Sequence, residues 1–171
     1  MLEAGVKLVR QQGFAGTSID QLCREAGVTK GAFFAAAPYH HHADPAQRVL
    51  GYIDLRTELI AGPAESFSCV AGTMVQEAFL SSEPIRAACN SSILGNAAAL
   101  EDDLAAAIDQ SGASGVTAAS LARHIQAVIQ GAFVLAKAGG VAGAAAAARE
   151  HLLHLRRYFE MLLTNENTRA D

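Results

Sequence analysis

A threonine and a lysine stand side by side at the start of a short helical segment, where their side chains could bind phosphate. Thr29 and Lys30 directly follow Gly27 and Val28, which are typical of a tight turn. The first N–H groups of a helix, together with the helix dipole, favour an anion. A hydroxyl and an ammonium at this place are therefore suited to the phosphates of a nucleic-acid backbone.

Two preceding patterns predict the helices that would position this segment. The first helix has an apolar face formed by Leu2, Val6 and Val9. It ends near Gly13, and Thr17 or Ser18 caps a second helix. The second apolar face consists of Ile19, Leu22, Cys23 and Ala26. The bend at Gly27 predicts a helix-turn-helix, which places one helix in the major groove of DNA, although an ordinary helical hairpin in a core is the alternative.

Four segments in this region resemble the DNA-binding head of TetR-type transcriptional repressors. They are Gly13-Phe14, Thr17-Ser18, Ala26-Gly27-Val28 and Thr29-Lys30-Gly31-Ala32-Phe33-Phe34. The resemblance covers the first 34 residues, and beyond them only the helical layout agrees. It implies an all-α fold, with an N-terminal helix-turn-helix head and a C-terminal helical bundle. It also implies a homodimer that binds a near-palindromic double-stranded DNA operator.

The resemblance assigns DNA contacts to Thr17, Ser18, Thr29, Lys30, Gly31, Ala32 and Phe34. Thr29 and Lys30 would contact phosphates, and the next two residues would lie against base edges. Phe34 stands where the family usually has a tyrosine, so the hydroxyl contact to a phosphate is lost.

The sequence departs from the family pattern after Phe34. The family continues the recognition helix and then opens a fourth helix that links head and body, but here Phe34 runs into Ala35 and Pro38 without that signal. Either this variant lacks the linker, or a stretch between Phe34 and Ala35 is missing. We expect the second, because a folded head needs a connection. We divide the chain into a head, 1–38, and a body, 39–171.

Charge and composition agree with a cytoplasmic regulator. The net charge of −4 divides into +1 for residues 1–34 and −5 for the rest. An acidic body would repel DNA while the head approaches it. The longest run free of strongly polar residues, 138–148, is far shorter than the roughly 20 residues of a membrane span. Cys23, Cys69 and Cys89 lie among apolar neighbours, and we expect reduced core thiols.

Beyond residue 43 the patterns are helical throughout. Asp44-Pro45 caps one helix, which stops before Gly62-Pro63. A second helix is predicted from about residue 68 to 81, and a long third helix from 82 to about 110. Thr117 caps the first of two final helices. Gly139-Gly140 joins these two, so we expect antiparallel neighbours.

The last two helices carry more apolar surface than one face needs. This surplus predicts a dimer interface, although the same residues could face the core of one chain at similar odds from the pattern alone. The resemblance favours the interface, because dimers in that family use their last two helices. The predicted interface residues are Leu121, Val128, Leu135, Leu152, Leu155 and Phe159.

The body is expected to bind a small apolar effector whose binding releases DNA. The candidate lining residues are Phe67, Met74, Phe79, Ile93, His124 and Phe133, although each of them taken alone is more often simple core. His124 is the candidate polar group, because it stands alone among apolar neighbours.

No catalytic residue, metal site or cofactor is predicted. His40-His41-His42 are adjacent, and His151 and His154 lack the further ligands of a closed zinc site. No nucleophile elbow or phosphate loop is present, so an enzyme has no specific support. The rival hypothesis is a dimeric helical ligand-binding or interaction module that does not bind DNA.

Overall fold

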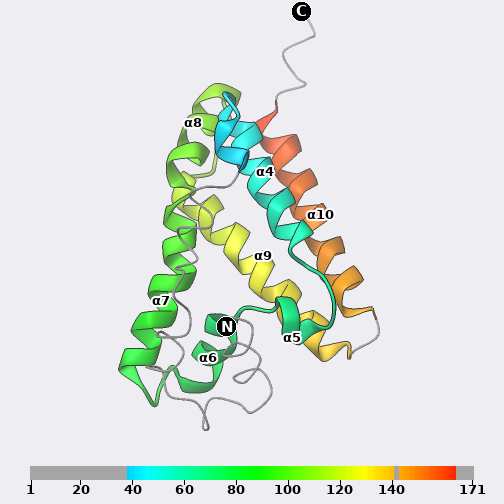
Figure 1. The fold of residues 1–171 in the computed structure, drawn as a ribbon. Coiled ribbons are helices and arrows are strands. Elements are labelled where there is room, and N and C mark those ends of the chain that lie inside the picture. Colours follow the sequence, from blue (N-terminus) through cyan, green and yellow to red (C-terminus); the bar gives the residue numbers. More distant parts are fainter. Residues whose placement is uncertain (1–37, 141–142, 165–171) are drawn as a thin grey trace, which may run out of the picture.

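The computed structural model describes residues 38–140 and 143–164, and every regular element in these ranges is helical (Figure 1). The all-α prediction is therefore confirmed for this part of the chain. In chain order the elements are η2 (Pro38–His41), α4 (Pro45–Glu58), α5 (Ala64–Phe67), α6 (Val70–Ala78), α7 (Glu83–Ala98), α8 (Glu101–Ser111), α9 (Ala118–Ala138) and α10 (Ala144–Leu163).

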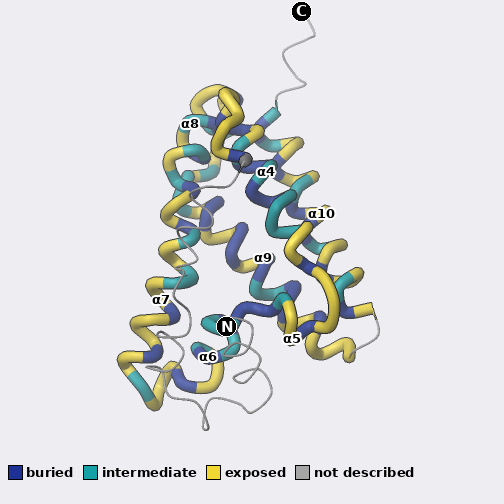
Figure 2. Tube along the Cα trace, in the orientation of Figure 1, coloured by how far each residue is buried: buried dark blue, intermediate teal, exposed yellow. Residues whose placement is uncertain are grey.

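Helices α4, α8, α9 and α10 form what we call the main bundle. Helix α9 packs against α10 and α8, and α4 packs against α10 and α8. Ile125 and Ile129 on α9, with Leu152 and Phe159 on α10, are fully buried. Figure 2 shows the buried stretch of α9 in the interior of the molecule. The 3.6-residue periodicity of both helices therefore directs one apolar face into a shared core.

Two helix starts follow the capping signals of the sequence. The Asp44 carboxylate accepts a hydrogen bond from the Ala46 N–H at 2.9 Å, and Pro45 follows it. At α9, the Thr117 hydroxyl accepts from the Ser120 N–H while the Ser120 hydroxyl accepts from the Thr117 N–H. These bonds satisfy N–H groups that have no partner within the helix.

The helix predicted over 82–110 is two helices, which is a correction. Helix α7 ends at Ala98 and α8 begins at Glu101. Leu100 is buried at the junction, where it enters the core of the main bundle. Three acidic residues, Glu101, Asp102 and Asp103, occupy the first turn of α8, where the helix dipole favours negative charge. This acidic run was the available signal for a helix start.

The segment predicted as one helix over 68–81 also differs. A single turn, α5, precedes it, and α6 ends at Ala78. The Cys69 sulfur accepts a hydrogen bond from the Gly72 N–H at 3.4 Å and so caps α6. Cys69 and Cys89 are buried, reduced thiols, as predicted, whereas Cys23 lies outside the described residues.

Helices α6 and α7 pack on each other and form what we call the α6–α7 unit. Its buried residues make a small cluster separate from the core of the main bundle: Met74, Ala78, Ile85 and Cys89. In Figure 1, α5 and α6 lie at one end of the molecule, and η2 and α8 lie at the other.

Candidate functional site

The residues predicted to contact DNA lie outside the described part of the chain. They are Thr17, Ser18, Thr29, Lys30, Gly31, Ala32 and Phe34. The peptide between Phe34 and Ala35 also lies outside it, so the expectation of a missing stretch at this point stays a prediction.

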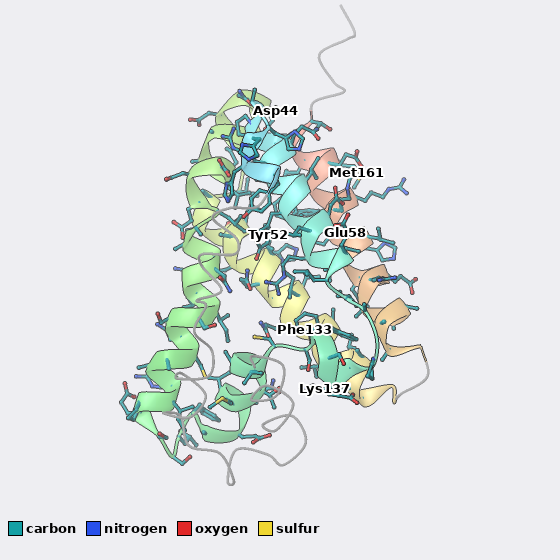
Figure 3. All side chains as sticks on the ribbon, in the orientation of Figure 1. Asp44, Tyr52, Glu58, Phe133, Lys137 and Met161 are labelled. Carbon is teal, nitrogen blue, oxygen red and sulfur yellow. The ribbon has the colours of Figure 1, made fainter. Side chains whose placement is uncertain are left out.

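Two of the predicted effector residues meet in the body. The rings of Phe67 on α5 and Phe133 on α9 have centroids 5.7 Å apart and are tilted by 55°. Phe133 is buried and Phe67 is half-buried. This contact attaches the single turn of α5 to the main bundle, and Figure 3 shows Phe133 at that end of α9.

Three other predicted effector residues belong to the α6–α7 unit. Met74 is part of its small core, and Ile93 on α7 is half-buried. Phe79 follows the end of α6 and is 51% exposed. Phe79 therefore lies at the surface rather than in an interior pocket.

His124 does not occupy the interior position that the sequence suggested. Its side chain is exposed, and its ring meets the ring of Tyr158 on α10 edge to face, with centroids 5.6 Å apart. The next residue, Ile125, is fully buried, and successive helical residues point about 100° apart. The helix therefore turns His124 away from the core.

One polar side chain that does enter the core is that of Gln126, which sequence reasoning missed. Its side-chain amide donates a hydrogen bond to the Tyr52 hydroxyl of α4 at 3.1 Å, and both residues are buried. Gln126 stands three residues before Ile129 and seven before Phe133, which places these three side chains on one face of α9. That spacing was the signal for a polar group within an apolar face.

A second tyrosine extends this polar cluster toward η2. The ring of Tyr39 meets that of Tyr52 edge to face, with centroids 5.7 Å apart. The pKa of Tyr39 is raised to about 12, first by burial and then by the nearby Tyr52 and Asp103, while Arg56 acts in the opposite direction. The hydroxyl of Tyr39 is therefore held in its neutral form over the physiological range.

A hollow of about 240 Å³ opens between α6 and α9, and it involves none of the six predicted effector residues. Its lining residues are Thr73, Gln76, Glu77, Val134 and Lys137.

The six predicted interface residues divide into two groups. Leu121, Leu152, Leu155 and Phe159 are buried within a single chain. Their side chains fill the core and offer no surface to a partner, so we correct their assignment. Leu135 is 55% exposed and Val128 is half-buried, so these two remain available for an interface.

Other apolar residues on the last two helices do lie at the surface. Met161 is 69% exposed, and Val134, Leu153 and Tyr158 are also exposed. Figure 3 shows Met161 on the outer side of α10.

Neither histidine group forms a metal site in the structure. The imidazole of His154 lies 3.9 Å from the Glu150 carboxylate, and both side chains are largely exposed. Over residues 38–140 and 143–164, no three histidine, cysteine, aspartate or glutamate side chains converge as metal ligands. In the same ranges, no helix combines the length and apolar character needed to cross a membrane.

A helical body that follows a head with helix-turn-helix spacing is the layout of a two-part regulator. Comparison with known proteins specifies the class. Residues 1–37 match the family of bacterial regulatory proteins of the tetR type. Residues 45–151 match the C-terminal domain of transcriptional regulators of the LmrA/YxaF-like type. The chain is also similar to the HTH-type transcriptional regulator LmrA of Bacillus subtilis (strain 168), with 26% identity over 164 residues, covering 79% of this chain and 83% of the relative.

The chain therefore belongs to the TetR family of DNA-binding transcriptional regulators, with an LmrA/YxaF-like C-terminal domain. The sequence predicted an N-terminal helix-turn-helix head and a helical C-terminal body, and these are the two kinds of domain that the matches identify. Because this family is not enzymatic, the expectation that the chain is not an enzyme is confirmed.

Proposed function

We propose that this regulator acts in the cytoplasm as a homodimer on a near-palindromic operator, and that a small apolar effector bound in the body releases it from DNA. The observation that carries the dimer is a surface shared by the two final helices. Two recognition helices held at a fixed separation can enter successive major grooves, whereas a single weakly basic head would bind poorly.

The proposed dimer surface, which we call the α9–α10 face, consists of His124, Val128 and Leu135 on α9 with His154, Tyr158 and Met161 on α10. Each set recurs at helical spacing, so its members share one side of the helix. The ring contact between His124 and Tyr158 joins the two sets into one surface. An apolar patch that remains exposed on a folded chain is a typical protein–protein interface.

The oligomeric state tests this surface directly. Leu135→Asp combined with Met161→Asp would bury two charges at the two-fold seam, so we expect a monomer in sedimentation velocity. Leu80→Asp is the matched control, because Leu80 is 87% exposed but lies after α6, on another part of the molecule. A wild-type chain that is already monomeric would contradict the proposal, and so would a double variant that stays dimeric.

We place the boundary between head and body at residues 38 and 39. Support comes from the two family matches, which end at residue 37 and begin at residue 45. The alignment with the Bacillus relative extends over 164 positions, but it covers only 79% of this chain of 171 residues. Part of it therefore pairs residues of the relative with gaps in this chain, which fits an absent connecting segment.

DNA binding is tested with the chain's own upstream fragment in a fluorescence anisotropy titration, using a scrambled duplex as control. Lys30→Ala is expected to weaken binding to every sequence and to lower the salt slope by about one unit, because one phosphate contact is lost. An unchanged slope would remove Lys30 from the contacts. Equal affinity for both duplexes would favour the rival module that does not read an operator.

The effector is proposed to bind along the face of α9 that carries Gln126 and Phe133. This face presents an aromatic end at the Phe67–Phe133 contact and a polar end at the Gln126–Tyr52 hydrogen bond. Seven residues separate the two ends on the helix, or about 10 Å at 1.5 Å per residue. A largely apolar molecule of this length with one polar group matches both ends.

An apolar fluorescent probe, anilinonaphthalene sulfonate, can report on this region. Phe67→Ala should weaken probe binding and should also weaken competition by any compound that releases DNA. His124→Ala is the control, because its exposed ring lies on the α9–α10 face and should leave probe binding unchanged. Weaker probe binding in His124→Ala than in Phe67→Ala would mean that the effector binds in another region.

A further inference from the structure

The hollow between α6 and α9 combines both signs of charge with an apolar wall. Thr73, Gln76 and Glu77 share one face of α6, because they are spaced by three and four residues. Val134 and Lys137 stand one turn apart on α9 and close the other side. Figure 3 shows Lys137 at the α5–α6 end of the molecule.

The cationic side of the hollow is held in place by a hydrogen bond. The Lys137 ammonium donates to the Thr73 hydroxyl at 2.6 Å, and that hydroxyl donates to the Cys69 carbonyl at 3.2 Å. An ammonium has three N–H donors, so Lys137 can serve a carboxylate as well. The Thr73 hydroxyl therefore holds the Lys137 ammonium in place, and it is the positive charge that would attract a small anion.

The other side of the hollow offers hydrogen-bond acceptors. The Gln76 amide nitrogen donates to the Gly72 carbonyl at 2.8 Å, which leaves its amide oxygen as an acceptor. Glu77 adds an exposed carboxylate one residue along. Glu77 lies four residues after Thr73, which is slightly more than one helical turn, or roughly 6 Å along α6. The acceptors of Gln76 and Glu77 therefore lie toward one end of the hollow, and the Lys137 ammonium lies toward the other end, beside Thr73.

We propose that this hollow binds a small zwitterion, an amino acid with a short apolar side chain. Its carboxylate binds the Lys137 ammonium, its ammonium binds Glu77 and Gln76, and its side chain packs on the partly exposed Val134. The span of about one turn fits charges separated by one or two carbon atoms. The volume, about 240 Å³, is below that of typical pockets for drug-sized ligands, so a small molecule is favoured.

This site differs from the proposed apolar effector region and does not depend on it. A ligand here would bridge α6 to α9, where contact is already close, because a Cβ on Gly72 would collide with the Gln130 side-chain amide. An occupied hollow would therefore hold the α6–α7 unit against the main bundle.

The full chain is titrated with glycine, alanine, valine and leucine by isothermal calorimetry, with binding checked by ligand-observed NMR. Two analogues of valine that each lack one charged group serve as controls: isovalerate has no ammonium, and isobutylamine has no carboxylate. We expect at least one amino acid to bind at millimolar concentration or below, and both analogues to bind at least tenfold more weakly than valine. Amide hydrogen exchange in α6 should slow when the amino acid is bound.

Variants connect the binding to the hollow. Glu77→Gln and Lys137→Met should each weaken amino-acid binding tenfold or more, because each removes one charged partner. Glu58→Gln is the matched control, since Glu58 is exposed at the end of α4 and lies away from Lys137 in Figure 3. Circular dichroism checks that the variants fold. Lack of binding by all four amino acids, equal binding of isovalerate, or unchanged affinity in Glu77→Gln would overturn the proposal.

Discussion

The main bundle and the α6–α7 unit are built from similar helices but are held together to different extents. In the main bundle, Phe159 is fully buried, and ion pairs tie α4 to its neighbours. Arg48 lies 2.6 Å from Asp103 of α8, and Arg156 of α10 lies 2.7 Å from Asp54. The α6–α7 unit has a core of only four buried residues, and the exposed side chains of Phe79 and Leu80 follow α6.

This difference separates a scaffold from a part that can move at lower cost. Local opening requires little free energy where few apolar contacts are lost. A regulator needs one region that keeps its shape and another whose position a ligand can bias. We therefore expect the main bundle to determine global stability and the α6–α7 unit to open locally. Single substitutions in the two parts should therefore differ in how much they destabilise the chain and in how far the effect spreads.

Phe159→Ala should destabilise the whole chain by about 3–5 kcal/mol, because it leaves a large cavity at a fully buried site. Urea unfolding at one fixed protein concentration, followed by circular dichroism, measures the change. Leu80→Ala is the control and should stay within about 0.5 kcal/mol, because Leu80 is exposed. Similar losses for both variants would contradict the central role of the main bundle.

Met74→Ala should have a smaller and more local effect, about 2 kcal/mol, the lower end of the usual range for a buried Met, because the small cluster can collapse around the lost atoms. Hydrogen exchange measured by mass spectrometry should accelerate within residues 70–98 and change little in α4 and α10. Equal acceleration across all these helices would mean that the α6–α7 unit is not a separate cooperative part.

Gly72→Ala should cost at most about 1 kcal/mol, because the added methyl group meets the far end of the flexible Gln130 side chain, which can move away, and because alanine is the better helix former. Adding Gln130→Ala should recover much of this loss. Gly95→Ala is a matched control in the interior of α7, where a Cβ would meet nothing within 4 Å. Because alanine is the better helix former, that variant should gain up to about 1 kcal/mol. Destabilisation by Gly95→Ala would mean that the space around each glycine does not determine the effect of the added methyl group.

Alkaline pH should weaken the end of the main bundle that contacts η2. The pKa of Tyr39 is raised to about 12 from the ordinary value of 10.0, so folding favours the neutral phenol. That contribution is fully present below pH 10.0 and is lost as the pH rises toward about 12. Thermal melting across this range should show a steeper loss for the wild type than for Tyr39→Phe, which cannot ionise there. Parallel curves would remove Tyr39 as the cause.

Arg156→Gln should have the smallest effect, about 0–1 kcal/mol, because exposed ion pairs are screened by water and salt. The Arg156 side chain is 30% exposed and that of Asp54 is 45% exposed. The difference from wild type in urea unfolding should shrink as salt is raised. A loss as large as that of Phe159→Ala would mean that charge pairing, rather than the apolar core, holds α10 on α4.

Much of the fold could be predicted because its signals are local. Asp44-Pro45 and Thr117 set helix starts through bonds to residues two or three positions away. The glycine pair at 139–140 separates two periodic segments that are antiparallel neighbours in the structure. The break before α8 was missed because Leu100 continues the apolar periodicity and its backbone dihedrals, φ −101° and ψ −8°, stay in the right-handed helical region.

The candidate sites were less predictable because they depend on distant residues. Gln126 was overlooked, yet its partner Tyr52 lies on α4, 74 positions away in the sequence. His124 looked like a polar group among core residues, but its ring contact is with Tyr158 on the outer side of α10. The hollow beside α6 arises only where that helix crosses α9.

The sequence by itself determined the family of this regulator and its all-helical character. It also determined the angular order of residues around each helix, because that order depends on neighbours within about one turn. Only the tertiary structure decided which side of each helix is covered. Periodicity gives the angle between His124 and Gln126, but the packing of α4 and α10 against α9 decides that the glutamine is buried and the histidine is exposed.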